Sequence, residues 1–460
     1  MHIDPLLRSH RGIAPARAKA LLQQERTAFV ERNPRSRALA ERASRHLLFG
    51  VPLHWMNDWG TPFALQVAQA VGARLSDADA HTLADFCLGD TGAMFGHSPA
   101  PVARALARQA GSGLTAMLAG EDAAVVGELL GERFGLPYWQ FAMTATDANR
   151  FVLRWLRAAS GRRKLLVFNG CYHGAVDDVF VDLVGGRRHQ RDSLLGQVHD
   201  LTAHTVVVEF NDLAALEGAL AEGDVAMVLA EPAMTNIGMV LPAPGYWEAA
   251  QALLRRHDVA LVLDETHTIS CGPGGYSRTH GLQPDAIVLG KPVGGGVPCA
   301  VYGFSADWAE RVMQAKRRAA PGHSGIGTTL SGNLLAMAAV RATLTELMTE
   351  AVYAPMLAGA AALAGGLRER IAHHRLPWCV TQLGARTEFQ FCATPPRNGH
   401  EAGAAGDAGL EHLIHLALLN RGVLITPFHN MMLVCPATSR ANIEQLLDAF
   451  DTVLGLISDA

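Results

Sequence analysis

The stretch LVLDETHTIS, residues 261–270, runs three aliphatic residues directly into two acids, Asp264 and Glu265. An uninterrupted aliphatic run is typical of a strand that is buried on both faces of a parallel sheet. In α/β proteins the ligand site lies where such strands end. The stretch therefore indicates a carboxylate at the functional edge of a sheet, and the alternative is an acid that only meets water.

Four other short aliphatic runs, bounded by polar or glycine residues, have the same character: 164–169, 205–210, 225–232 and 285–290. Residues 212–222 and 245–257 have apolar side chains at three- and four-residue spacing, which predicts helices between strands. Alternation of strand and helix implies a mostly parallel sheet covered on both faces. The expected fold class is α/β.

Both ends of the chain differ from this middle part. Helical patterns occupy 1–47, 335–372 (as two helices) and 440–457. Residues 398–409 are small, polar and unpatterned, which predicts a mobile loop. We expect a large domain over 79–337 and a smaller α+β domain assembled from 1–78 and 338–460.

Composition limits the function classes. The chain has 460 residues and a net charge of −4, which gives no electrostatic case for a nucleic-acid partner. Its seven scattered cysteines argue against a disulfide framework or zinc site and favour a reducing compartment. The N-terminus lacks the apolar core of a signal peptide, and no stretch reaches the roughly 18 apolar residues of a membrane span. We expect a cytoplasmic protein without a membrane partner.

A second aliphatic run ends in VLGKPVGGG, residues 288–296, with Lys291 at its end. The glycines indicate a tight turn or a close approach of the backbone to another group. A P-loop is excluded, because Pro292 and Asp285 stand where that motif needs Ser or Thr and Gly. Neither a G-x-G-x-x-G after a strand nor an H-E-x-x-H metal motif is present, so we expect no metal.

A lysine and an acid at neighbouring strand ends suit pyridoxal phosphate. The lysine forms a Schiff base with this cofactor, and a carboxylate keeps its pyridine nitrogen protonated. The cofactor also needs an anion site at a helix N-terminus. The stretch AMTATDANRFVLRWLRA, 142–158, provides a candidate whose first residues are Thr144, Ala145 and Thr146. The alternative for the two threonines is ordinary helix capping.

The sequence resembles the class III pyridoxal-phosphate aminotransferases, and within them the glutamate-1-semialdehyde aminomutase and β-amino-acid aminotransferase branch. The resemblance runs from about residue 80 to 350 and more weakly to both ends. Five motifs carry it in the family's order: GRRKLLVFNGCYHG (161–174), AEPAMTNIGMVLP (230–242), LVLDETHTI (261–269), LGKPVGGGVPCAVYG (289–303) and GTTLSGNLLAMAA (327–339). It implies a fold-type I enzyme.

The resemblance also implies roles for the matching residues. Lys291 would form the Schiff base and then shuttle a proton between substrate and cofactor carbons, and Asp264 would pair with the pyridine nitrogen. Tyr172 would stack on the ring, with Asn236 near its substituents. Core packing for Tyr172 and turn capping for Asn236 are the alternatives.

The phosphate would lie against Ala145 and Thr146. Thr329 would reach the same phosphate from the neighbouring subunit, so a homodimer would share its active sites. Glu231 and Glu265 would supply supporting hydrogen bonds. Two histidines near these motifs, His173 and His267, are interpreted as supporting or structural rather than catalytic.

Two motifs depart from the family pattern. The family's Ser-Gly-Thr-Glu reads Thr144, Ala145, Thr146 and Asp147 here. The valine of Asp-Glu-Val is Thr266. Both changes are small in volume and leave the chemistry in place, which indicates a divergent subgroup rather than an inactive relative.

The resemblance implies an aminotransferase that exchanges an amino group between an amine or amino-acid donor and a carbonyl acceptor in a ping-pong reaction. The first alternative is a 2,1-aminomutase acting on an amino aldehyde such as glutamate-1-semialdehyde. The second is a non-catalytic binding protein on the same fold, which would have little reason to keep Lys291, Asp264 and Thr329 together.

The expected substrate class follows from the absence of arginine in two segments of the chain. Related enzymes hold a substrate carboxylate with arginine, whose planar fork suits it, yet residues 49–63 and 424–436 contain none. The candidate substrate residues in these stretches are His54, Trp55, Trp59, Phe428 and His429. We expect amines or unusual amino compounds as substrates, unless an arginine elsewhere, such as Arg278, binds a carboxylate.

Overall fold

The computed structural model describes residues 11–459 and divides into two compact units. Of the described residues, unit 1 holds those up to 99, 354–395 and those from 405 onward; unit 2 holds 100–353 and 396–404. The boundaries differ from those expected at 78/79 and 337/338. The first boundary lies after residue 99 instead of 78, because strand β3 (Thr82–Asp85) pairs with β2 and β15 of unit 1. The second boundary lies after residue 353 instead of 337, because Tyr353 Oη donates to Ile269 O within unit 2.

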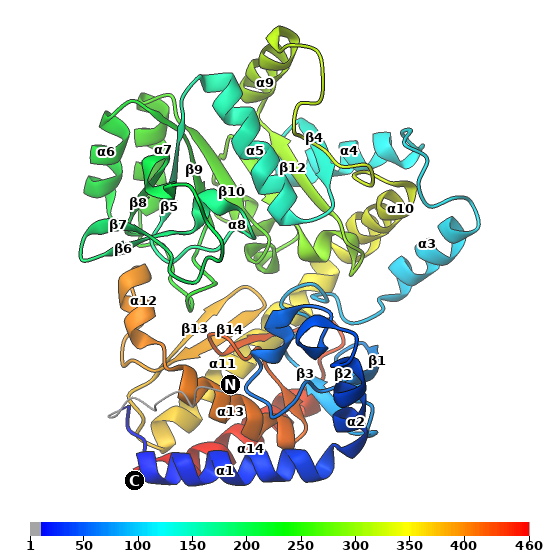
Figure 1. Cartoon of the computed structure of the whole chain (residues 1–460), viewed down its shortest axis with the longest axis vertical. Helices are drawn as coiled ribbons and strands as arrows, with labels where there is room; N and C mark the ends of the chain where they lie inside the picture. Colours follow the sequence, from blue (N-terminus) through cyan, green and yellow to red (C-terminus); the bar gives the residue numbers. More distant parts are fainter. Residues whose placement is uncertain (1–10, 460) are drawn as a thin grey trace. The chain divides into compact units, whose positions relative to one another are not determined.

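Unit 2 is built on a seven-stranded sheet of order β4-β12-β11-β10-β9-β5-β8 (Figure 1). The strands are β4 (Tyr138–Ala142), β5 (Lys164–Phe168), β8 (Thr205–Val208), β9 (Val225–Ala230), β10 (Ala260–Asp264), β11 (Ala286–Leu289) and β12 (Ala300–Phe304). Neighbours from β11 to β8 pair in parallel, and β12 is antiparallel to both of its neighbours. The predicted mostly parallel sheet is confirmed.

Both faces of this sheet are covered, which is why its strands are aliphatic throughout. Every residue of β9, β10 and β11 is buried. Successive side chains of a strand point to opposite faces. One face packs on α5 (Ala145–Ser160), whose Val152 joins Val262 and Val288 in one core cluster. Helix α7 (Tyr246–Arg256) packs on β10 and α6 (Leu213–Ala221) on β8.

Unit 2 has further helices and a hairpin around this sheet. Its remaining helices are α3 (Ala100–Ala110), α4 (Asp122–Phe134), α8 (Gly275–Thr279), α9 (Ala306–Arg318) and α10 (Leu334–Ala342). A hairpin of β6 (Val181–Val184) and β7 (Arg187–Gln190) follows β5.

The loop predicted over 398–409 is wrong. Helix α12 (Gly399–Ala405) and the start of α13 (Ala408–Asn420) occupy most of it. Asn398 Oδ1 accepts from the Glu401 N–H at 2.9 Å, and Asp407 caps α13 by accepting from the Leu410 N–H. These side-chain caps start helices in a stretch whose small residues gave no apolar pattern.

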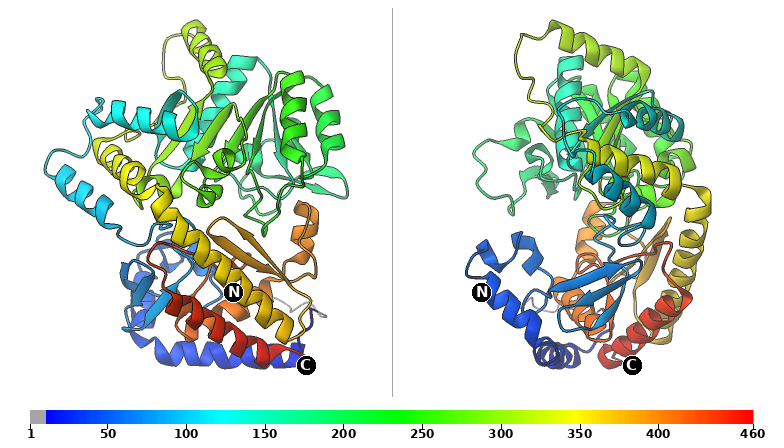
Figure 2. Two further views of the ribbon diagram at one scale, coloured as in Figure 1. Left: turned by 180° about the vertical axis from the view of Figure 1, so that it is seen from behind. Right: turned by 90° about the vertical axis from the view of Figure 1, so that its right-hand side faces the viewer.

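Unit 1 combines two small sheets with long helices, as expected for an α+β domain. Its sheets are β1-β2-β3-β15 (Val67–Val71, Arg74–Asp77, Thr82–Asp85, Val423–Leu424) and β13-β14-β16 (Cys379–Leu383, Arg386–Gln390, Met431–Leu433). Its helices include α1 (Pro15–Arg32), α2 (Pro34–Ala43), α11 (Glu350–His373) and α14 (Arg440–Ile457). Helices α1, α13 and α14 lie side by side (Figures 1 and 2).

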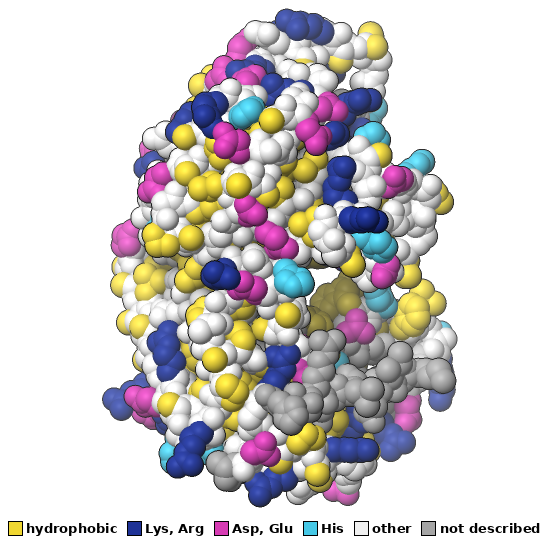
Figure 3. All heavy atoms as spheres, turned by 90° about the vertical axis from the view of Figure 1, so that its left-hand side faces the viewer, with side chains coloured by type: hydrophobic (Ala, Val, Ile, Leu, Met, Phe, Trp, Pro, Cys, Tyr) yellow, Lys and Arg dark blue, Asp and Glu magenta, His cyan; other side chains and the backbone are white. Residues whose placement is uncertain are grey.

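Helix α11 is long and apolar enough, by length and composition alone, to cross a membrane. Its residues Leu363, Ala364 and Leu367 have no exposed surface and belong to the core of unit 1. This is the behaviour of a core helix. On the face drawn in Figure 3, basic and acidic side chains are interspersed rather than separated by sign.

Candidate active site

The predicted cofactor residues of unit 2 follow strands that run in one direction. β4, β5, β9, β10 and β11 all point the same way, so their carboxyl ends meet at one edge of the sheet. Asp264 ends β10, and the segments that follow the other strand ends carry the remaining predicted residues: Thr144, Ala145, Thr146, Tyr172, Asn236 and Lys291. This is the edge where α/β proteins bind their ligands.

Asp264 ends β10 and is only 5% exposed. Its Oδ1 accepts from the Thr266 N–H at 3.1 Å. Its Oδ2 accepts from Asn149 Nδ2 at 2.9 Å and lies 3.1 Å from His173 Nδ1. Burial alone would raise the pKa of Asp264, but His173 and the other donors lower it to about 2. The carboxylate is therefore ionised at neutral pH.

His173 is the cation of a buried ion pair. Burial would lower the pKa of its imidazole, but the hydrogen bond and the charge of Asp264 raise it to about 10. Glu231 differs from Asp264, because burial raises the pKa of its carboxyl, against the opposing effect of the His173 charge. The pKa values of the two acids are thus shifted in opposite directions, downward for Asp264 and upward for Glu231.

The N-terminus of α5 opens onto the same edge. Thr144 is the helix cap, since its Oγ1 accepts from the Asp147 N–H at 3.2 Å. Thr146 Oγ1 accepts from the Ala175 N–H at 3.1 Å and so holds the loop after β5. The N–H groups of the first helical turn have no acceptor within a helix. Such an end suits a phosphate.

Two glycines bring this helix end against the neighbouring loops. A Cβ on Gly290 would lie 2.8 Å from the Ala145 Cβ, and one on Gly174 would lie 2.1 Å from Thr146 Oγ1. Gly174 also has φ +80°, which glycine adopts without strain. The lysine loop and the Tyr172 loop therefore both pack directly on the helix N-terminus.

Lys291 follows Gly290 in a strained backbone conformation. Its φ is +46°, which is uncommon for a residue with a side chain and often marks functional sites. Its Nζ lies 2.8 Å from His267 Nε2. Thr266, where the family has valine, accepts from the Gly290 N–H through Oγ1 at 3.2 Å. This departure ties the loop after β10 to the lysine loop.

Glu265 is fully buried, and its carboxylate bonds to the loop after β10 and to helix α8. It accepts from Thr268 Oγ1 at 2.5 Å, from the Tyr276 N–H at 3.0 Å and from the Ser277 N–H at 2.7 Å. Burial raises the pKa of its carboxyl. Its hydrogen bonds hold the loop that carries Asp264.

These groups fit pyridoxal phosphate. The edge supplies an ionised acid, an amine and a helix N-terminus, which are the groups that hold this cofactor. Tyr172 is 44% exposed, so part of its side chain is accessible for stacking. Asn236 is half-buried and lowers the pKa of Glu231 by a hydrogen bond. Thr329 is exposed in unit 2, and its expected contact with a partner's phosphate stays a prediction.

The candidate substrate residues all lie in unit 1. The Trp59 and Phe428 rings are 6.5 Å apart, whereas His54 packs against Phe49. Burial would lower the pKa of His429, but the charge of Glu388, 3.2 Å away, raises it. Trp55 is 40% exposed. Their role in substrate binding stays a prediction.

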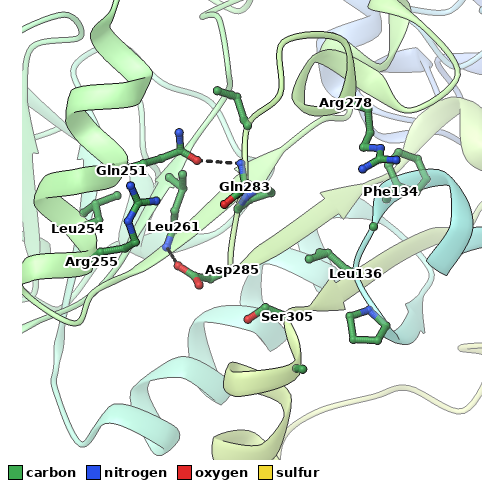
Figure 4. Close-up of a pocket in the computed structure, with 15 residues that line it drawn as sticks. Phe134, Leu136, Gln251, Leu254, Arg255, Leu261, Arg278, Gln283, Asp285 and Ser305 are labelled. Atoms are coloured by element: carbon green, nitrogen blue, oxygen red, sulfur yellow. Dashed lines mark hydrogen bonds between the residues drawn. The ribbon is translucent and has the colours of Figure 1, made fainter.

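Arg278 does not lie at the same edge of the sheet as Asp264. It lines a pocket of about 560 Å³ together with Leu261 and Asp285, at the amino ends of β10 and β11 (Figure 4). The Asp285 carboxylate accepts from the Leu261 N–H at 2.9 Å. Burial raises the pKa of Asp285 to about 6. The structure therefore does not support Arg278 as the carboxylate ligand of the same chain.

Sequence reasoning missed one residue of the site and interpreted another as structural. Asn149 is 1% exposed and stands in the middle of an otherwise apolar helix face, which is a signal of a buried hydrogen bond. His267 looked structural, yet it contacts the lysine amine. For His173, the interpretation as a supporting histidine agrees with its bond to Asp264.

The ion pair predicts a pH dependence of stability. A histidine whose folded pKa is raised stabilises the fold below its unfolded value of 6.5, and this contribution is lost as pH rises towards about 10. Urea unfolding of the cofactor-free protein, followed by tryptophan fluorescence, should show a midpoint that falls between pH 6.5 and 9.5. His173→Gln should flatten this fall, whereas exposed His204→Gln should keep it. An equal fall in all three proteins would contradict the ion pair.

Comparison with known proteins agrees with this site. The family model described as aminotransferase class III matches residues 55–454. A glutamate-1-semialdehyde 2,1-aminomutase of Anaeromyxobacter sp. (strain Fw109-5) is 32% identical over 83% of this chain and 89% of its own length. One of Bordetella avium (strain 197N) is 31% identical over 92% and 99%.

Solved structures extend the comparison to the fold. A glutamate-1-semialdehyde aminomutase from Pseudomonas aeruginosa PAO1 superposes with a TM-score of 0.94 at 51% identity, covering 97% of this chain and 99% of its own. A variant of a protein of the same description was solved in complex with PMP. A β-phenylalanine aminotransferase from Variovorax paradoxus gives a TM-score of 0.84 at 25% identity, over 95% and 97%. The fold is that of the pyridoxal-phosphate aminotransferases, and the chain belongs to the class III aminotransferase family, whose cofactor is pyridoxal 5′-phosphate.

Proposed function

We propose that this chain is an aminomutase that moves an amino group between neighbouring carbons of one amino aldehyde, such as glutamate-1-semialdehyde. The observation that carries this proposal is the 51% identity, over 97% of the chain, to the Pseudomonas aeruginosa protein of that description. Curated relatives at 31% to 33% identity bear the same name. This ranks the aminomutase above the aminotransferase favoured by the sequence motifs.

The site residues have defined tasks in this chemistry. Pyridoxal phosphate, when bound, supplies an electron sink for the charge left by removal of a substrate proton. Asp264 would hold the proton on the pyridine nitrogen, because its own carboxyl stays ionised. Lys291 Nζ would accept the substrate proton and return it at a neighbouring position. The first N–H groups of α5, at Ala145 and Thr146, would bind the phosphate, and Tyr172 would cover the ring.

An aminotransferase with amine donors is the second candidate. It is favoured by the absence of arginine from 49–63 and 424–436. Glutamate-1-semialdehyde carries a carboxylate, for which a guanidinium fork is the usual ligand. An amine without a carboxylate would need no such ligand.

We also propose a homodimer with shared active sites. Four exposed apolar side chains flank the Thr329 segment: Leu114 (51%), Met117 (81%), Leu118 (77%) and Leu330 (46%). The segment that carries Leu114, Met117 and Leu118 lies next to the segment after Thr329, because the Leu335 N–H donates to Leu114 O at 3.2 Å. Exposed apolar side chains gathered in this way mark protein interaction surfaces.

The cysteines support a further proposal, that the protein works in the cytoplasm. All seven lie among the described residues and none forms a disulfide. Six of them are buried. Unpaired cysteines are typical of a reducing compartment.

Lys291→Ala should abolish turnover and the visible band of the lysine-bound cofactor. Asp264→Asn should keep the cofactor bound but slow the reaction by about a hundredfold or more, because a neutral amide cannot hold the pyridinium proton electrostatically. Absorbance spectra and initial rates test both variants. A band that persists without Lys291 would point to another lysine, and near-parental activity of Asp264→Asn would place that acid away from the ring nitrogen.

Substrate assays separate the two candidate functions. An aminomutase should convert glutamate-1-semialdehyde with no added donor or acceptor, because the amino group returns to the same molecule. An aminotransferase should instead consume a donor together with an acceptor, and alanine, glutamate, a β-amino acid and an aryl-alkyl amine test its range. Turnover of amines alone would contradict the aminomutase proposal, and strong preference for glutamate would contradict the amine alternative.

The dimer is tested by separating assembly from cofactor contact. Met117→Arg with Leu118→Glu should give monomers in light scattering and weaken cofactor binding, because each site loses the partner's Thr329. Thr329→Ala should remain dimeric but bind the cofactor more weakly, while added cofactor should favour the parental dimer by mass action. A fully active, cofactor-saturated monomer would contradict the shared site.

A further inference from the structure

The amine of Lys291 has a histidine partner to which the family resemblance assigns no catalytic role. His267 comes three residues after Asp264, is 5% exposed, and places Nε2 at 2.8 Å from Lys291 Nζ. Both residues follow adjacent parallel strands, β10 and β11. The contact therefore joins the acid loop to the lysine loop at the site edge.

The backbone that carries His267 is fixed from several sides. The Ile269 N–H donates to Glu265 O at 2.8 Å, and Tyr353 Oη donates to Ile269 O at 3.0 Å. The buried carboxylate of Glu265 accepts from the N–H of Ser277 at 2.7 Å. A side chain on such a loop keeps its direction, because its own rotamer is the main freedom left to it.

The lysine, by contrast, has a long flexible side chain on a strained backbone. Its four-carbon stem loses considerable rotamer entropy when the amine is held in one place. Thr266 Oγ1 holds the preceding Gly290 N–H at 3.2 Å, so the Lys291 backbone is fixed while its amine depends on side-chain contacts. His267 provides one of these contacts at hydrogen-bond distance.

We propose that His267 is a positioning residue for Lys291, which orients the amine for covalent capture of the cofactor and takes up its proton. The proposal rests on the role of Lys291 as the Schiff-base lysine, but not on the identity of the substrate. The lysine ammonium passes one proton to His267 Nε2 and attacks the aldehyde carbon with the freed electron pair. The carbonyl oxygen leaves as water with the two remaining amine hydrogens, and the proton on His267 returns to the new nitrogen.

The test compares the capture of pyridoxal 5′-phosphate with the binding of pyridoxamine 5′-phosphate, which has the same ring and phosphate but no aldehyde. After cofactor removal, the visible band that grows on adding pyridoxal phosphate reports bond formation by the lysine. In His267→Ala this band should grow roughly 10- to 100-fold more slowly, the range expected when a reacting group is misplaced. Calorimetry should show pyridoxamine phosphate binding at parental affinity.

Three further variants of this chain serve as controls. His267→Gln keeps a hydrogen-bonding group at similar reach but cannot take up a proton, so its band should grow faster than that of His267→Ala and more slowly than that of the parent. Lys291→Ala gives the baseline without a band, and His204→Gln, at an exposed position, should behave as the parent. Parental band growth in His267→Ala, a matching loss of pyridoxamine phosphate affinity, or a Gln variant whose band grows no faster than that of His267→Ala or as fast as that of the parent would each overturn the proposal. A wrong substrate assignment would leave these measurements unchanged, whereas a band in Lys291→Ala would overturn the role of the lysine itself.

Discussion

The carboxylate of Asp264 is an ionised group in a buried position, and the rest of the site depends on keeping it so. A buried charge is costly unless it is paired and hydrogen-bonded. Here the partners come from separate parts of unit 2: Asn149 from α5, His173 from the loop after β5, and the N–H of Thr266 from its own loop. The one charge thereby fixes the relative positions of the elements that would hold the ring and phosphate of the cofactor.

Close packing adds a second constraint at the same edge. Gly290 brings the lysine loop onto Ala145, and Gly174 brings the Tyr172 loop onto Thr146, at distances that leave no room for a side chain. The α5 N-terminus therefore lies beside the lysine proposed to capture the cofactor. The proposed chemistry follows from this arrangement, since the phosphate, the ring nitrogen and the reactive carbon of one small molecule would each meet a different fixed group.

The sequence predicts those parts of the molecule that local chemistry determines. The aliphatic runs became the central strands because both faces of the sheet are buried, and Asp264 and Lys291 follow from their places at strand ends. Asn149 was missed, and the lysine contact of His267 was not foreseen, because their partners are distant in sequence and a single polar residue has no periodic signal. The loop predicted over 398–409 failed because its helices start from side-chain caps rather than from an apolar pattern.

The central claim is that Lys291 captures the cofactor beside Asp264. The chain has four lysines: Lys19, Lys164, Lys291 and Lys316. Reduction of the cofactor-loaded protein with borohydride makes the lysine bond permanent, and peptide mapping by mass spectrometry then locates it. The account predicts the added mass on the peptide that contains Lys291, and the same mass on a peptide carrying any of the other three lysines would contradict it.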